Sequence, residues 1–241
     1  MTTFDPRLYG ARWAEIYDEV HTGLMDDAGA VTALAELAAG GPVLEFGAGT
    51  GRLAVPLAGR GVEVVGVDIS PEMLAKLKEK SAAVTVVEAD MTTVALEREF
   101  AVAFIAFNSI FVLETQEEQV ALFRNAARHL RPGGRFVLET VVVKPPTADH
   151  GKLSVVKVEA DRVTLSGGTS DPVTGNYRGT WMVVEPGGTT FYPQGGRTVT
   201  HHEMDLMAQL AGLERENRWS DWKGTPFGPK AELHVSVYRK P

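Results

Sequence analysis

The sequence predicts an α/β fold organised around a mostly parallel, doubly wound sheet. Three observations support this prediction. Short apolar runs at residues 43–46, 62–68 and 84–91 are of the kind found in parallel strands covered on both faces. Segments with helical spacing separate these runs, and a glycine-rich turn follows the first of them. A chain of 241 residues is long enough for one sizeable α/β domain.

Composition narrows the possible partners. The chain has 24 basic and 31 acidic residues, a formal charge of −7, and no run of five like charges, which disfavours nucleic acid as a partner. It has no cysteine, which excludes disulfides, thiolate zinc sites and a cysteine nucleophile. No apolar run approaches the length of a membrane span, and the first residues do not resemble a signal peptide. We expect a cytoplasmic monomer or homodimer without a membrane partner.

The chemistry centres on residues 43–54, VLEFGAGTGRLA. Gly47, Gly49 and Gly51 follow an apolar run and precede helical spacing, so the stretch predicts a strand, a glycine loop and a helix. Glycines are useful where φ must be positive or where a ligand must approach the main chain. The loop lacks the Lys and Ser/Thr of a phosphate-binding loop and the Gly-x-Gly-x-x-Gly spacing of a dinucleotide loop. Glu45 would repel a pyrophosphate and would suit a ligand with an ammonium or sulfonium charge.

The run E-F-G-A-G-T-G resembles the first motif of class I S-adenosylmethionine-dependent methyltransferases, whose usual form is D/E-x-G-x-G-x-G. The stretch HLRPGGRFVLE at residues 129–139 is typical of the fifth strand of that family and the turn before it. The resemblance implies a Rossmann-like, seven-stranded sheet, S-adenosyl-L-methionine as cofactor and S-adenosyl-L-homocysteine as product. The specific motifs cover about residues 43–140, whereas the order of elements matches nearly the whole chain. The residues that the motif places at the cofactor are Glu45, Gly47, Ala48, Gly49 and Gly51.

Acids at the next two strand ends are expected to complete the cofactor site. Asp68 lies 68 − 47 = 21 residues after the first loop glycine, where α/β folds place a carboxylate that binds ribose hydroxyls. Ser70 and Pro71 already supply a helix N-cap and a first-turn proline, which leaves Asp68 for a ligand. Asp90 and Met91 resemble the family pair that contacts adenine; the alternative is a surface acid beside a core methionine. The other expected cofactor-binding residues are Tyr17, Ile69, Met73, Phe107 and Asn108.

Residues 7–20 predict one amphipathic helix with an aromatic stripe. Such a stripe is either core or, as in the family that the chain resembles, a cover over the cofactor with Tyr17 near its methionine end. Asn108 and Ser109 are the only hydrogen-bonding side chains within the very apolar run at 100–113, and they are either ligand contacts or a capped loop. The aromatic side chains at 181 and 192 are expected either to line an apolar pocket or only to pack against the strands around them. The candidate substrate-binding residues are Tyr9, Trp13, Ser109, Phe111, Trp181 and Tyr192.

The organisation along the chain follows from these patterns. We expect a single domain over 1–241, with a helical lid at 1–40, which includes a second helix at 28–39, and a cofactor-binding core at 43–143. Alternating stretches bounded by Gly, Pro, Asp and Asn predict an antiparallel β insertion at 144–200, laid over the substrate pocket after the fifth strand. Thr115-x-x-Glu118 and Thr200-x-x-Glu203 are capping boxes. A final helix and an antiparallel strand pair are expected at 201–241.

His201 invites a metal or a catalytic interpretation. The sequence His201-His202-Glu203 lacks the second histidine of the helical zinc proteases, because position 206 is Leu, so no metal site is expected. His201 and Asp205 lie four residues apart and predict a hydrogen-bonded pair, although His201 could also reach the pocket as a base. Tyr17 is the second candidate catalytic residue. A serine hydrolase is disfavoured because no Gly-x-Ser-x-Gly elbow is present.

The sequence therefore predicts an S-adenosylmethionine-dependent methyltransferase that acts on a nitrogen or oxygen of a small molecule or a peptide terminus. N-S-I-F-V-L, the Gln-Glu-Glu helix and A-R-H-L-R-P-G-G resemble small bacterial N-methyltransferases of aminosugars or peptide N-termini. Two alternatives stay open. A nicotinamide-dependent oxidoreductase with a degenerate loop is opposed by Glu45 and the loop spacing. A non-catalytic S-adenosylmethionine-binding protein would share the cofactor motifs.

Overall fold

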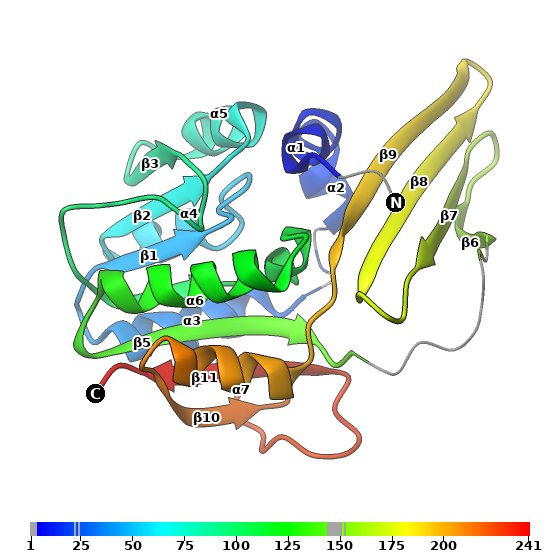
Figure 1. Cartoon of the computed structure of the whole chain (residues 1–241). Helices are drawn as coiled ribbons and strands as arrows, with labels where there is room; N and C mark the ends of the chain where they lie inside the picture. Colours follow the sequence, from blue (N-terminus) through cyan, green and yellow to red (C-terminus); the bar gives the residue numbers. More distant parts are fainter. Residues whose placement is uncertain (1–3, 22, 24, 144–150, 152) are drawn as a thin grey trace.

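A seven-stranded, mostly parallel sheet forms the centre of the computed structural model, which describes residues 4–21, 23, 25–143, 151 and 153–241. The strand order is β10-β11-β5-β4-β1-β2-β3 (Figure 1). Only β11 runs antiparallel to its two neighbours, β5 and β10. The predicted fold class is thereby confirmed. The strands are β1 (Val43–Phe46), β2 (Val64–Asp68), β3 (Val84–Glu88), β4 (Phe100–Ile105), β5 (Leu130–Val141), β10 (Glu214–Trp219) and β11 (Leu233–Arg239).

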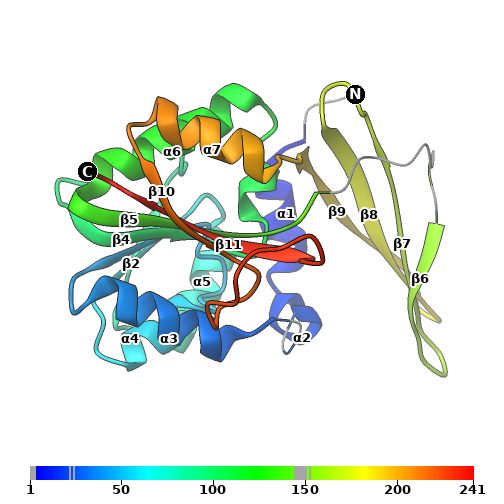
Figure 2. The same cartoon turned by 90° about the horizontal axis from the view of Figure 1, so that it is seen from below.

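Helices cover both faces of this sheet, and Figure 2 shows the two layers from below. α6 (Gln116–His129) and α7 (His201–Leu210) lie on one face, and α3 (Asp27–Ala38), α4 (Ala54–Gly59) and α5 (Pro71–Lys80) belong to the other. Every residue of β1 is buried, because Leu44 and Phe46 enter the first core while Val43 enters the second. Both predicted capping boxes are present, at the start of α6 and of α7.

The topology places a crevice at the end of β1. The chain steps from β1 to β2 and β3 on one side, and to β4 and β5 on the other, so the connections diverge above β1. In open α/β sheets ligands bind at this switch point, beyond the carboxyl ends of the strands. The glycine loop, Asp68 and the segment after β4 all lie at that edge.

A second, antiparallel sheet follows β5 and contains β6 (Leu153–Val158), β7 (Val163–Ser170), β8 (Asn176–Glu185) and β9 (Gly188–Arg197). These strands match the antiparallel pattern of the predicted insertion; residues 144–150 and 152, where the insertion is expected to begin, lie outside the described residues. In Figure 1 the sheet stands beside α1 and α2. Arg197 N–H donates to the Leu113 carbonyl (3.1 Å), and the Asn176 amide donates to the Glu114 carbonyl (2.7 Å). These bonds fix the insertion to the segment that follows β4.

The N-terminal segment forms two short helices, α1 (Pro6–Trp13) and α2 (Tyr17–His21). The prediction of one helix over 7–20 is therefore wrong. The Ile16 N–H donates to the Trp13 carbonyl three residues back (3.0 Å), and this tighter turn ends the first helix. Trp13 is fully buried and donates its indole N–H to the Pro193 carbonyl of β9 (3.2 Å). α1 is thus held against the second sheet.

Candidate active site

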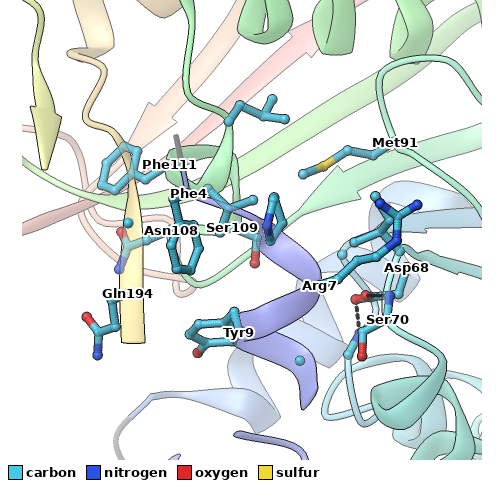
Figure 3. Close-up of a pocket in the computed structure, with 18 of the residues that line it drawn as sticks. Phe4, Arg7, Tyr9, Asp68, Ser70, Met91, Asn108, Ser109, Phe111 and Gln194 are labelled. Atoms are coloured by element: carbon cyan, nitrogen blue, oxygen red, sulfur yellow. Dashed lines mark hydrogen bonds between the residues drawn. The ribbon is translucent and has the colours of Figure 1, made fainter. Parts of the chain in front are cut away.

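A cavity of about 900 Å³ lies at the crevice above β1. Its walls come from the glycine loop, the ends of β2, β3 and β4, helices α1 and α2, and strands β8 and β9, and Figure 3 shows the side chains that meet there. A volume of this size is near the upper end for sites that bind small molecules, ~300–1,000 Å³. The predicted residues that line it are Tyr9, Tyr17, Gly47, Gly49, Asp68, Ile69, Met73, Asp90, Met91, Phe107, Asn108, Ser109, Phe111 and Trp181.

The glycine loop has the backbone that its sequence predicts. Gly47, Gly49 and Gly51 have φ of 69°, 54° and 84°, in the region that favours glycine. A Cβ on Gly49 would meet nothing within 4 Å, so this position leaves room for a ligand. A Cβ on Gly51 would come within 2.8 Å of Leu77 and of Val55, so this glycine allows close packing instead. Of the predicted cofactor residues, Gly51 and the buried Ala48 do not line the cavity.

Asp68 connects the loop to the end of β2. Its Oδ2 accepts the Gly49 N–H (2.8 Å) and its Oδ1 accepts the Ser70 N–H (2.9 Å), the latter drawn in Figure 3. Ser70 caps α5 by accepting the Met73 N–H (3.2 Å), as the sequence predicts. Burial raises the pKa of Asp68, and the backbone N–H groups oppose that rise. Each carboxylate oxygen keeps a second lone pair, so ribose hydroxyls can add to these contacts.

Glu45 lies behind the loop and does not line the cavity. Its side chain is 4% exposed, and among the described residues nothing hydrogen-bonds its Oε2. Burial raises its pKa to about 8, with Arg52 lowering it and Asp68 raising it. A positive charge bound at the adjoining glycine loop would favour the ionised form of this carboxyl group, so the site fits the sulfonium and ammonium charges of S-adenosylmethionine.

The acid expected at adenine makes a local turn. Asp90 Oδ1 accepts both the N–H and the hydroxyl of Thr92 (2.7 Å each), while Met91 is held through its carbonyl by Asn125 (2.8 Å). Both residues of the pair line the cavity. Their contact with adenine stays a prediction.

The segment after β4 is shaped by Glu139 of β5. Phe107 and Asn108 both have positive φ, 51° and 63°, an uncommon conformation for residues with side chains. The Phe107 N–H donates to Glu139 Oε2 (3.0 Å), and Asn108 Oδ1 accepts the Val141 N–H (2.7 Å). Trp222 donates to the other Glu139 oxygen (2.6 Å). The side chain of Asn108 thus also has the structural role that the sequence left open.

His21 is a cavity residue that the sequence did not single out. Its ring stacks on Tyr17, with 4.3 Å between ring centroids, and meets the edge of Phe107 at 5.2 Å. The i,i+4 spacing from Tyr17 was the available signal, but the predicted helix ended at residue 20. Gln194 and Tyr177, from the second sheet, also line the cavity and carried no signal.

Three of the predicted catalytic and substrate-binding residues lie away from the cavity. Trp13 is a core residue with no exposed surface, and Tyr192 packs on it with ring centroids 5.2 Å apart. His201 packs against Phe227 and His234, at 5.2 and 5.7 Å between ring centroids. This placement does not support the base or substrate roles expected of these three residues.

The predicted pairing of His201 with Asp205 is also wrong. The Asp205 carboxylate accepts from Arg218 (2.6 Å), Arg215 (2.8 Å) and Tyr238 (2.9 Å). Strand β10 supplies both arginines, and their charge outcompetes a neutral imidazole. Within the part of the chain that the structure describes, no group of three or more His, Asp and Glu side chains could hold a metal ion, and no helix is long and apolar enough to cross a membrane.

Fold and site together define a class I S-adenosylmethionine-dependent methyltransferase, and the chain belongs to that family. Residues 43–134 match a family model described as a methyltransferase domain. The chain is 31% identical to the cypemycin N-terminal methyltransferase of a Streptomyces species, with 98% of this chain and 99% of that protein covered. It is 37% identical to the CcbJ methyltransferase of Streptomyces caelestis, whose structure matches with a TM-score of 0.92 over 98% of this chain and 99% of that one.

A more distant structure agrees in fold. The S-adenosylmethionine-bound amino pentose methyltransferase CalS10 of Micromonospora echinaspora is 21% identical and matches with a TM-score of 0.71, covering 100% of this chain and 99% of that one. The family match and the relatives at 31% and 37% identity confirm the predicted enzyme class and, with it, the cofactor. The oxidoreductase and the non-catalytic binding protein have no support among these relatives.

Gly10 provides a test of how α1 contributes to cofactor binding. A Cβ at this buried position would lie 2.1 Å from Ser70 Oγ and 2.3 Å from Ser70 Cβ. We expect Gly10→Ala to displace α1 and to weaken S-adenosylhomocysteine binding about tenfold, ~1.4 kcal/mol, measured by isothermal titration calorimetry. Alanine alone would favour the helix, so a loss must come from the clash.

The double variant Gly10→Ala, Ser70→Gly is the matched control. It removes both atoms that the new methyl group meets. We expect the Gly10→Ala change to cost less affinity for S-adenosylhomocysteine when it is made in the Ser70→Gly variant than when it is made in the wild type. Wild-type affinity in Gly10→Ala would show that the contact between α1 and α5 does not matter for the cofactor.

Proposed function

We propose that this methyltransferase acts on an amine nitrogen, either of an aminosugar or at a peptide N-terminus. Two relatives support this choice. The cypemycin N-terminal methyltransferase matches over nearly its whole length, and a dTDP-3-amino-3,4,6-trideoxy-alpha-D-glucopyranose N,N-dimethyltransferase of Streptomyces venezuelae is 27% identical over 66% of this chain. An acceptor of this kind is small enough for the cavity beside the cofactor.

The observation that carries the choice of nitrogen is the state of the carboxylates around the cavity. Among the described residues, every carboxylate that lines the cavity already accepts hydrogen bonds from the chain, so none of these carboxylates is left as a strong base. A neutral amine needs no strong base, and the modest help of an imidazole suffices for it, whereas a phenol or an alcohol needs stronger basic assistance. The lining carboxylates are Asp5, Asp68, Asp90, Glu114 and Glu118.

The residues divide between cofactor and acceptor. S-adenosylmethionine supplies an electrophilic methyl group when bound. Asp68 would orient its ribose, Glu45 would balance its ammonium group, and Tyr17 and Phe107 would enclose its methionine end. The acceptor half of the site would be formed by Tyr9, Ser109, Phe111 and Trp181. The expected lid at residues 1–40 and insertion at 144–200 would cover it. This enclosure would exclude water and hold the acceptor in line with the methyl group.

Matched acceptors test the proposal. Purified enzyme and S-adenosylmethionine labelled with tritium in the methyl group are incubated with glucosamine, trialanine, their N-acetylated forms, and catechol. We expect label on at least one free amine, none on its N-acetylated form, and none on catechol. Transfer to catechol, or to an N-acetylated compound as well as to its parent, would contradict the proposal. Titration with S-adenosylhomocysteine and with NADH tests the cofactor separately, and only the former should bind.

A further inference from the structure

We propose that His21 accepts the proton that the acceptor nitrogen gives up, which makes it a catalytic residue of the reaction. The proposal rests on the proposed function, because it requires an amine acceptor. It rests also on the position of the ring, on its tautomer, and on the groups that surround it.

His21 holds a fixed place in the wall of the cavity. It is the last residue of α2 and its side chain is 8% exposed. Its ring lies between Tyr17, Trp13 and Phe107, at 4.3, 5.6 and 5.2 Å between centroids. A ring packed on three sides by aromatic groups has few other rotamers available, so its free edge keeps one direction.

The hydrogen bond of Nδ1 determines the tautomer. Nδ1 lies 2.9 Å from the Tyr17 carbonyl oxygen. A carbonyl oxygen can only accept, so Nδ1 must carry the proton. In the neutral ring Nε2 therefore has the lone pair and can take up a proton.

Nε2 is also accessible. The described residues offer Nε2 no hydrogen-bond partner. The buried side-chain atoms without a partner in that part of the chain are Glu45 Oε2 and Arg162 Nε; since Nε2 is not one of them, it is not buried. An imidazole nitrogen that is unpaired, accessible and on the wall of the cavity is available to a ligand there.

The other titratable groups of the cavity are less suitable. The lining carboxylates are engaged as described above, and Glu114 in addition pairs with Arg178 (2.7 Å). Burial raises the pKa of Tyr17 to about 12 and that of Tyr9 well above its ordinary value, so both phenols keep their protons at neutral pH. No second histidine lines the cavity among the described residues.

The charges near His21 keep it neutral before the reaction. Burial lowers its pKa, and Arg52 lowers it further, while the bond to the Tyr17 carbonyl and the charge of Asp18 oppose this. Asp18 is itself bound to Thr50 (2.6 Å) and Lys80 (2.5 Å), and Arg52 pairs with Asp27. Trp13 and Phe107 carry no charge. The ring is therefore in its basic form near pH 7.

The nitrogen lone pair forms the bond to the methyl carbon while the carbon–sulfur bond breaks and its electron pair stays on sulfur. The nitrogen becomes acidic as this bond forms, and one of its protons moves to Nε2 in the same step, so the product is a neutral amine. The imidazolium formed in this way is destabilised by Arg52 and returns its proton to solvent.

Two variants separate catalysis from structure. Asn at position 21 can keep an N–H donor near the position of Nδ1 but offers nothing at Nε2, so His21→Asn is the test. His202→Asn, at an exposed histidine outside the cavity, is the matched control. We expect His21→Asn to bind S-adenosylhomocysteine within about twofold of wild type and to lower kcat about 100-fold at pH 7, in the range of general bases. The control should match wild type in both.

The pH profile and the ring itself give independent readouts. The kcat of the wild type should fall as pH drops below the lowered pKa of His21, and His21→Asn should lack this limb. Long-range ¹H–¹⁵N spectra of the wild type with S-adenosylhomocysteine should show a neutral ring protonated at Nδ1, and this measurement needs no acceptor.

Three results would overturn the proposal. They are an Nε2–H tautomer in the complex, unchanged kcat in His21→Asn, or a loss of S-adenosylhomocysteine affinity as large as the loss of kcat, which would make His21 a cofactor-binding residue. Methyl transfer to catechol alone would instead refute the amine acceptor, and the spectra would still report whether Nε2 is basic.

Discussion

Replacing Asp68 by alanine is expected to weaken S-adenosylhomocysteine binding about 100-fold. Hydrogen bonds to a charged group contribute about 1.5–3 kcal/mol each, and this carboxylate would lose those to ribose. It would also release the Gly49 N–H that it holds at 2.8 Å, so the glycine loop would lose its anchor. Isothermal titration calorimetry measures the affinity, and circular dichroism checks that the fold persists.

Asp90→Ala is the comparison for this experiment. Among the described residues the Asp90 carboxylate accepts hydrogen bonds only from Thr92, two residues away, whereas the Asp68 carboxylate connects two strand-end segments. We expect a loss of about tenfold for Asp90→Ala if the adenine amine donates to this acid, and less than twofold if the acid only shapes the turn. Unchanged affinity in Asp68→Ala would remove Asp68 from the ribose site.

The cofactor half of the site was predictable from sequence because local rules determine it. Positive φ requires glycine at Gly47 and Gly49, and a parallel sheet brings the residues after β1 and β2 to one edge. The position of Asp68 follows from strand and helix lengths alone. The spacing of a few residues thus specifies where these groups lie, whatever the rest of the chain does.

The acceptor half was less predictable because it depends on packing between distant segments. Trp13 and Tyr17 share a helical face in sequence, yet the break after Trp13 leaves one in the core and the other at the cavity. No Gly or Pro signals that break. Trp181 and Tyr192 face each other across β8 and β9, and only Trp181 reaches the cavity. Periodicity shows which side chains share a face, but not what that face meets.

His201 shows the same limit from the other direction. A histidine next to a capping box invites a catalytic role, but strand β10 brings Arg218 against Asp205, and β11 brings His234 against the imidazole. The final strand pair was correctly predicted, whereas the polar contacts between its strands and α7 depend on the register, which no local pattern specifies.

Glu45→Gln is expected to change how stability depends on pH. The ordinary pKa of this carboxyl is 4.5 and burial raises it to about 8 in the folded protein. The folded state therefore binds more protons than the unfolded state between these values, and this group makes wild-type stability fall as pH rises from about 4.5 to 8. The slope is at most about 1.4 kcal/mol per pH unit, or about 3–6 °C in Tm per pH unit for a chain of this size. Glutamine cannot ionise, so the variant should lack this slope in thermal melts from pH 5 to 8.

Cofactor affinity at alkaline pH should be higher in the wild type than in Glu45→Gln. A cation next to Oε2 stabilises the charged carboxylate, so wild-type affinity for S-adenosylhomocysteine should rise as pH increases from 6 to 8, because less proton release opposes binding. Glu45→Gln has no such charge to offer, and we expect it to bind about tenfold more weakly at pH 8, with an affinity that changes little with pH. Equal pH dependence in both proteins would mean that Glu45 stays protonated in the complex and does not balance the charge of the cofactor.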